Sequence, residues 1–237
     1  MMRLDKYLAE MGVGTRQEVK KQIRQGKAAV NGTVVKAADT KIDETCDEVT
    51  IGGRNISYVS YEYYMLNKPA GVVSATEDRR DTTVIDLIKE KKRKDLFPVG
   101  RLDKDTEGLL LITNDGDLAH RLLAPKKHVD KVYYAKVAGI VTEEDVERFA
   151  QGIDIGTDEE EMTRPAQLDI LKSGEESEIR LTIHEGKFHQ VKRMFQAVKK
   201  EVTYLKRERM GTLCLDEDLK PGEYRLLTEE EIENVRK

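Results

Sequence analysis

A short apolar run at residues 109–112 sets the tightest limits on how this chain folds, because the turn sequence Thr-Asn-Asp-Gly follows it at residues 113–116. A run of this length before a turn signal is typical of a buried β-strand rather than of a helix. Asp103 precedes the run and lies next but one to Arg101. We therefore expect Asp103 in a loop that leads into a core strand, either as a buried ion pair or as a functional group.

The size and composition are those of a soluble globular protein. The chain has 237 residues, of which 36% are charged and 38% hydrophobic, which is enough for one large domain or two modest ones. No apolar stretch approaches the roughly 18 residues of a membrane helix, and the charged N-terminus lacks the apolar core of a signal peptide. We expect a cytoplasmic protein in which the isolated Cys46 and Cys214 are free thiols.

The net charge of −4 conceals two basic segments. Residues 1–36 and residues 184–211 each contain eight Lys or Arg against three Asp or Glu, whereas residues 143–161 and the C-terminal tail are acidic. Local density of this kind suits a polyanion such as RNA bound on one face. The alternative is a set of ordinary solvated helix faces.

The N-terminal residues predict two helices followed by a hairpin. Apolar residues within 3–11 recur at helical spacing, and residues 15–18 (Thr-Arg-Gln-Glu) form a capping box at the start of a second, basic helix. Asn-Gly at residues 31–32 lies between two short apolar runs, which is the signal for a tight hairpin turn.

This arrangement of residues 1–57 resembles the RNA-binding domain named after ribosomal protein S-four. The resemblance implies that the basic helix and the hairpin grip structured RNA. The residues at the expected contact positions are Arg16, Lys20, Arg24 and Lys27. Without the resemblance, these four side chains would read as the solvated face of an amphipathic helix.

Three stretches of the rest of the chain resemble RNA pseudouridine synthases of the RsuA family, whose type member acts on the small ribosomal subunit. They are residues 100–116 (GRLDKDTEGLLLITNDG), the Lys-x-Tyr of residues 131–133 and residues 185–195 (EGKFHQVKRMF). The Lys-Pro-Ala-Gly turn at residues 68–71 resembles the opening of the catalytic domain. The resemblance implies an α+β fold: after the N-terminal α/β domain and a linker at residues 58–62, residues 63–237 form a catalytic domain with a mixed, mostly antiparallel sheet and flanking helices.

The resemblance also implies roles for individual residues. Asp103 is the catalytic carboxylate, Tyr133 packs against the uracil ring and is a candidate for proton transfer, and Arg101 helps to hold the flipped nucleotide. The cation that pairs with the catalytic Asp falls at Lys192, where we expect arginine in many relatives. Because a lysine lacks the bidentate fork of arginine, either Lys192 or its RNA-binding neighbour Arg193 is the partner of Asp103.

Three further features of the sequence have plainer interpretations. Lys68 is either structural or in contact with RNA. The sequence places no second metal ligand at a suitable spacing from His189, which we interpret as hydrogen-bonded structure. The lysine-rich residues 89–94 are expected to be a solvated stretch.

The implied function is isomerisation of one uridine of small-subunit (16S) ribosomal RNA to pseudouridine, after the nucleotide has flipped out of its helix. This reaction needs neither cofactor nor metal, and the sequence has no glycine-rich phosphate loop or ligand cluster. The expected partner is ribosomal RNA within a partly assembled small subunit, bound by a monomer. The alternatives are a large-subunit synthase, which the wording of residues 189–195 disfavours, and a non-catalytic ribosome-assembly factor. A metal-dependent hydrolase would want a second carboxylate close by.

Overall fold

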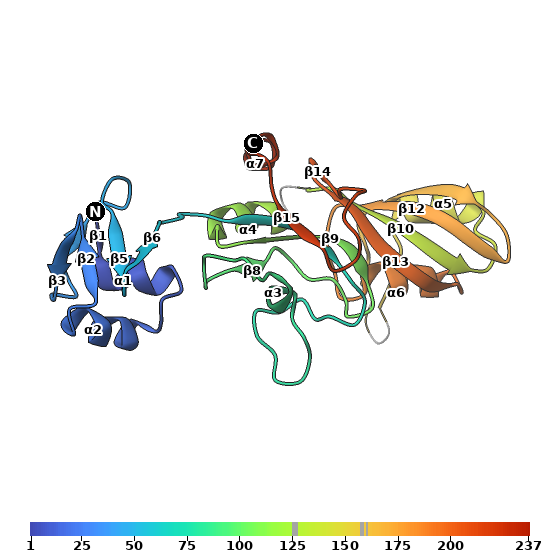
Figure 1. Cartoon of the computed structure of the whole chain (residues 1–237). Helices are drawn as coiled ribbons and strands as arrows, with labels where there is room; N and C mark the ends of the chain where they lie inside the picture. The colour runs from blue at the N-terminus through green and yellow to red at the C-terminus, as the bar shows by residue number, and fades with distance from the viewer. Residues whose placement is uncertain (125–127, 157–158, 160) are drawn as a thin grey trace. The chain divides into compact units, whose positions relative to one another are not determined.

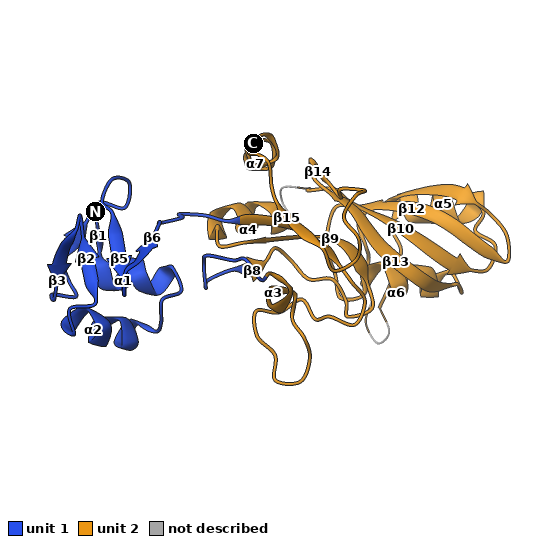
Figure 2. Ribbon diagram, viewed as in Figure 1, with its two compact units in different colours: residues 1–62, 89–96 blue, residues 63–88, 97–237 orange. Residues whose placement is uncertain are grey.

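The computed structural model describes residues 1–124, 128–156, 159 and 161–237 (Figure 1). The chain separates into two compact units (Figure 2). Unit 1 consists of Met1–Glu62 and Lys89–Leu96, and unit 2 of Tyr63–Ile88 and Phe97–Lys237. The chain therefore leaves unit 1, returns to it and leaves it again before most of unit 2 is complete.

Unit 1 packs two helices of its chain against a small antiparallel sheet whose order is β3-β2-β5-β6. Thr15 and Glu18 form the predicted capping box at the start of α2, and Asn31 and Gly32 both have positive φ in the predicted hairpin turn. The apolar faces of both helices lie in one core with β2 and β5. The elements are α1 (Leu4–Glu10), α2 (Arg16–Arg24), β2 (Ala28–Val30), β3 (Thr33–Val35), β5 (Val49–Ile51) and β6 (Arg54–Ile56), with β1 (Met2–Arg3) paired to β4 (Lys41–Ile42).

The returning segment Lys89–Leu96 is fixed to unit 1 rather than solvated along its length. Arg93 is only 4% exposed, and its guanidinium binds the carboxylates of Glu10 and Asp95. Glu62, at the end of the expected linker, accepts the backbone N–H of Arg93 at 2.7 Å. The expectation of a solvated stretch is therefore wrong for Arg93, because partners that are distant in sequence draw it into the interior.

Unit 2 is built on a twisted sheet with the strand order β11-β12-β10-β13-β9-β7-β15, onto which β8 and β14 are added (Figure 1). Among these strands β13 and β9 run parallel and the other neighbours antiparallel, which confirms the predicted mixed, mostly antiparallel sheet. The strands are β7 (Tyr63–Lys68), β8 (Phe97–Pro98), β9 (Glu107–Thr113), β10 (Lys131–Ala138), β11 (Gln167–Lys172), β12 (Glu176–Ile183), β13 (Glu201–Met210), β14 (Leu213–Cys214) and β15 (Tyr224–Leu226).

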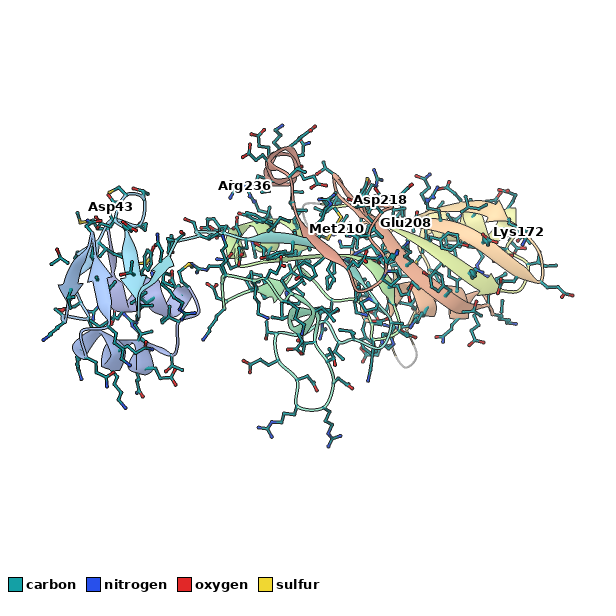
Figure 3. The ribbon with its side chains drawn as sticks, viewed as in Figure 1. Asp43, Lys172, Glu208, Met210, Asp218 and Arg236 are labelled. Carbon is teal, nitrogen blue, oxygen red and sulfur yellow. The ribbon has the colours of Figure 1, made fainter. Side chains whose placement is uncertain are left out.

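Helices of unit 2 cover the core of this sheet. Leu118 and Leu122 of α4 pack with β7 and β9, and the rings of Phe149 in α5 and Phe195 in α6 lie 5.0 Å apart. At the C-terminus, Arg236 of α7 (labelled in Figure 3) donates a hydrogen bond to the hydroxyl of Tyr63 on β7. The helices are α3 (Val84–Leu87), α4 (Gly116–Leu123), α5 (Glu143–Gln151), α6 (Gln190–Ala197) and α7 (Glu229–Arg236).

Candidate active site

Asp103 lies in the loop between β8 and β9, as expected, with its side chain 27% exposed. The nearest basic side chains are Lys192, with Nζ at 3.6 Å, and His189, with Nε2 at 3.5 Å from its carboxylate oxygens. Both distances exceed the roughly 2.7–3.2 Å of a good hydrogen bond. Within the described part of the chain the carboxylate is thus placed near positive charge without being closely bound.

The Asp103 loop is held from below by Lys68, the last residue of β7. Lys68 is fully buried, and its Nζ donates to the backbone carbonyls of Pro69 at 3.0 Å, Lys104 at 3.2 Å and Thr106 at 2.8 Å. Burial lowers the pKa of Lys68 to about 8, against the raising effect of neighbouring carboxylates. Of the two interpretations of Lys68, the structure supports the structural one.

The turn after Lys68 braces the same loop. Gly71, whose φ is +86°, donates its N–H to the carbonyl of Lys104 at 2.7 Å. The hydroxyl of Ser74 donates to the carbonyl of Leu102 at 2.8 Å and accepts the N–H of Leu102. The Lys-Pro-Ala-Gly turn therefore holds the loop after Asp103, and Ser74 holds it before Asp103.

Gly108 allows β9 to run directly beside β13. Its φ is +99°, and a Cβ built at this position would lie 2.3 Å from the carbonyl oxygen of Arg207. Only a residue without a side chain fits such an approach. Gly108 in the first motif thus has a structural reason, since it lets Arg207 of β13 lie alongside the strand that follows Asp103.

Of the two candidate cations, Lys192 on α6 is the one whose Nζ lies 3.6 Å from a carboxylate oxygen of Asp103. Its Nζ contacts both carboxylate oxygens of Asp105, at 2.6 and 2.8 Å, in addition to the longer contact with Asp103. The hydrogen bond from Lys192 lowers the pKa of Asp105. Arg193 turns away and binds Glu161 and the carbonyl of Ile155.

Tyr133 of β10 forms a wall common to two adjoining cavities. The smaller, of about 80 Å³, is lined by apolar Ile183 and Leu205 together with Asp103 and Lys192. The larger, of about 770 Å³, extends past Arg101. Tyr133 is 7% exposed, and no described residue makes a hydrogen bond to its hydroxyl. The sequence-predicted residues Arg101, Asp103, Tyr133 and Lys192 are thus brought together.

His189 belongs to this site, contrary to the interpretation of it as hydrogen-bonded structure. It occupies the N-cap of α6 in a left-handed conformation with φ +47°, and its ring stacks on the exposed Phe188 at 3.8 Å. This turn geometry directs the imidazole to Asp103, a placement that hydrophobic periodicity does not encode. Asp105 was also missed, although its place in the motif two residues after Asp103 was a usable signal.

The four RNA-binding candidates of unit 1 have different surroundings. Arg16 and Lys20 lie 3.5 and 3.7 Å from a carboxylate oxygen of the fully buried Asp5. Arg16, Arg24 and Lys27 are exposed, and Lys20 is partly buried. Burial would raise the pKa of Asp5, but a hydrogen bond from Arg3 and the charge of Arg16 outweigh it and lower the pKa. Arg16 and Lys20 therefore offset the charge of a buried carboxylate within unit 1, in addition to presenting positive charge at its surface.

Other classes of site find little support among the described residues. Their His, Cys, Asp and Glu side chains form no group of three or more that could hold a metal ion. None of the described helices has the length and apolar character that spanning a membrane requires. Cys46 and Cys214 are exposed free cysteines.

Comparison with known proteins agrees with this geometry. Residues 62–197 match the RNA pseudouridylate synthase family, and residues 2–49 match the S4 domain family. The chain is 49% identical to an uncharacterized RNA pseudouridine synthase of Bacillus subtilis, over 98% of this chain and 97% of that one. It is 44% identical to ribosomal small subunit pseudouridine synthase A of Vibrio vulnificus, over the full length of both.

A solved structure shows the same fold over the whole chain. The crystal structure of a pseudouridylate synthase superposes with a TM-score of 0.69 at 39% identity, covering 99% of this chain and all of the other. The family matches and the superposition therefore cover the motifs around Asp103, the sheet that carries them and the N-terminal domain. The chain belongs to the RNA pseudouridine synthase family, with an S4 domain ahead of its synthase domain.

Proposed function

We propose that this chain isomerises a uridine of small-subunit (16S) ribosomal RNA to pseudouridine, with Asp103 as the catalytic carboxylate. The observation that carries the proposal is the setting of Asp103, on a braced loop, beside Lys192 and across a cavity from Tyr133. Relatives named ribosomal small subunit pseudouridine synthase A, 41–44% identical over nearly the whole chain, support this choice of RNA.

The proposed isomerisation needs a carboxylate, a nearby cation and an aromatic ring, and the residues that line the smaller cavity supply these groups. The bond between C1′ and N1 breaks, the uracil turns, and C1′ joins C5, which loses its proton while N1 gains one. Asp103 acts as the base detaches, and the nearby Lys192 offsets its negative charge once substrate displaces water from the cavity. The ring of Tyr133 stacks on the uracil, and its hydroxyl is the candidate group for proton transfer.

RNA binding supplies the energy for flipping the nucleotide, which costs a few kcal/mol of unstacking. Arg24 and Lys27 of unit 1 hold phosphates of structured RNA, and Arg101 holds the flipped nucleotide at the cavity mouth. The substrate is a partly assembled small subunit in the cytoplasm, and the enzyme acts as a monomer.

The test is release of tritium from ribosomal RNA labelled at C5 of uridine, measured with small-subunit and large-subunit RNA separately and in the presence of a chelator. We expect release from small-subunit RNA that survives chelation. Release from large-subunit RNA alone would move the substrate to the other subunit. If neither naked RNA nor assembly intermediates give release while binding is tight, the chain is a non-catalytic binding factor.

A further inference from the structure

Two buried cations, Lys131 and Arg207, lie side by side under the larger cavity. Arg207 on β13 is the cross-strand partner of Tyr133, and Lys131 is two residues before Tyr133 on β10, so all three share one face of the sheet. Lys131 is 7% and Arg207 2% exposed. Both line the cavity of about 770 Å³ that also contains Asp103 and Arg101.

Neither cation has an acidic partner among the described residues. Nζ of Lys131 donates to the carbonyl of Val129 at 3.3 Å, and Nε of Arg207 to the carbonyl of Leu109 at 2.8 Å. The terminal nitrogen Nη2 of Arg207 is buried without any partner in the described part of the chain. A buried cation left in this state costs free energy that the fold must recover elsewhere.

The surroundings do not neutralise this pair of charges. Burial lowers the pKa of Lys131, and the charge of Arg207 lowers it further. Asp130 and Glu185 raise it, but Asp130 is bound to His184 at 2.8 Å, and Glu185 accepts hydrogen bonds from Arg164 and Gln190. The larger cavity therefore has a floor with excess positive charge.

We propose that Lys131 and Arg207 form a subsite for a backbone phosphate of the RNA next to the target uridine. The inference rests on the proposed function and deepens it. The uracil occupies the smaller cavity, and because Arg101, Asp103 and Tyr133 line both cavities, the sugar–phosphate chain continues into the larger one. A phosphodiester supplies the negative charge and acceptor oxygens that the lysine and guanidinium lack.

The test compares the affinities of uridine, uridine 5′-monophosphate and uridine 3′-monophosphate for the full chain by calorimetry at low salt. We expect one monophosphate to bind wild type about tenfold more tightly than uridine, as a charge-assisted hydrogen bond would give. In Lys131→Met, which keeps the buried stem, this preference should fall at least threefold. Lys172→Met is the control, since Lys172 is an exposed lysine at the far end of unit 2 (Figure 3), and it should keep the full preference.

A second measurement separates a ligand-binding lysine from a structural one. Removing a buried charge that awaits a ligand should leave the thermal midpoint of free Lys131→Met equal to or above that of wild type. A lowered midpoint with an unchanged preference for the monophosphates would overturn the subsite. Equal binding of uridine and the two monophosphates, or no binding of either monophosphate, would overturn it as well. Tritium release by wild type reports on the proposed function independently, so the two can fail separately.

Discussion

Asp103 and Asp105 lie on one loop, but their carboxylates have different surroundings. Lys192 contacts Asp105 at 2.6 Å, and the side chain of Asp105 is 70% exposed. Asp103 lies a full ångström farther from the same nitrogen and lines both cavities. Asp105 thus holds the lysine in place, while Asp103 keeps oxygens that are free to meet a substrate.

Under the proposed catalytic role of Asp103, Asp103→Asn should abolish the reaction, with at least about a 10³-fold loss in the rate of tritium release, because an amide cannot replace the carboxylate. RNA affinity should change little, since the proposed phosphate contacts are made by other residues. Single-turnover tritium release and filter binding measure the two effects. Asp105→Asn is the matched control on the same loop, and we expect it to stay within about tenfold of wild type because Lys192 then turns to Asp103. Equal losses in both variants would contradict the division of roles.

Lys68→Met should weaken both stability and catalysis. The substitution leaves the carbonyls of Pro69, Lys104 and Thr106 without their donor, so we expect a loss of about 2–4 kcal/mol in the free energy of unfolding. The rate of tritium release should fall because the Asp103 loop loses its support. Urea unfolding and single-turnover kinetics at neutral pH are the measurements.

The lowered pKa of Lys68 also predicts how the unfolding free energy depends on pH. Its pKa in the folded chain, about 8, lies below the ordinary 10.5, so between these values the unfolded chain binds a proton that the folded chain does not. The unfolding free energy of wild type relative to Lys68→Met should therefore rise as pH increases from 8 to 10.5. A flat difference curve would mean that Lys68 is not held in a desolvated site.

At the scale of elements, what the sequence predicts well is local. The capping box at α2, the Asn-Gly hairpin and the strand after Asp103 depend on neighbours in sequence, and all are present. The place of His189 depends on one left-handed residue, and the pairing of Tyr133 with Arg207 depends on the register of β10 against β13. Neither is visible in hydrophobic periodicity. Motifs located Asp103, Tyr133 and Lys192, but long-range packing decided their partners.

Gly108→Ala should disrupt the junction of β9 with β13. The Cβ of an alanine here would lie 2.3 Å from the carbonyl oxygen of Arg207, and the alanine backbone would have to adopt a φ of +99°. We expect a loss of more than about 3 kcal/mol of unfolding free energy, measured by urea denaturation. Gly116→Ala, in the first turn of α4 where no atom lies within 4 Å of the added Cβ, should be neutral or slightly stabilising. Similar effects of both substitutions would refute the close-approach explanation.

At the scale of the whole molecule, the chain passes between the two units more than once, because Lys89–Leu96 returns to unit 1. Arg93→Met should release this segment, because methionine cannot make the contacts of the guanidinium with Glu10, Asp95 and Tyr58. The amides of residues 92 and 93, which donate to Glu62, should then exchange with deuterium at least about tenfold faster. Lys94→Met, an exposed position of the same segment, is the control. Unchanged exchange in Arg93→Met would show that other contacts fix the segment.

The proposed contribution of unit 1 to RNA binding can be separated from catalysis through Arg24 and Lys27, because these exposed cations belong to unit 1 and Asp103 belongs to unit 2. The double variant Arg24→Gln with Lys27→Gln should lower the affinity for ribosomal RNA and reduce the slope of log affinity against log salt by about 1–2, one lost phosphate contact per cation. The rate at saturating RNA should stay at the wild-type value. Lys172→Gln with Lys220→Gln removes the same charge from exposed positions of unit 2 and should leave the slope unchanged. Filter binding over a salt series decides between them: an equal slope in the two double variants would mean that overall charge, rather than the surface of α2, attracts the RNA.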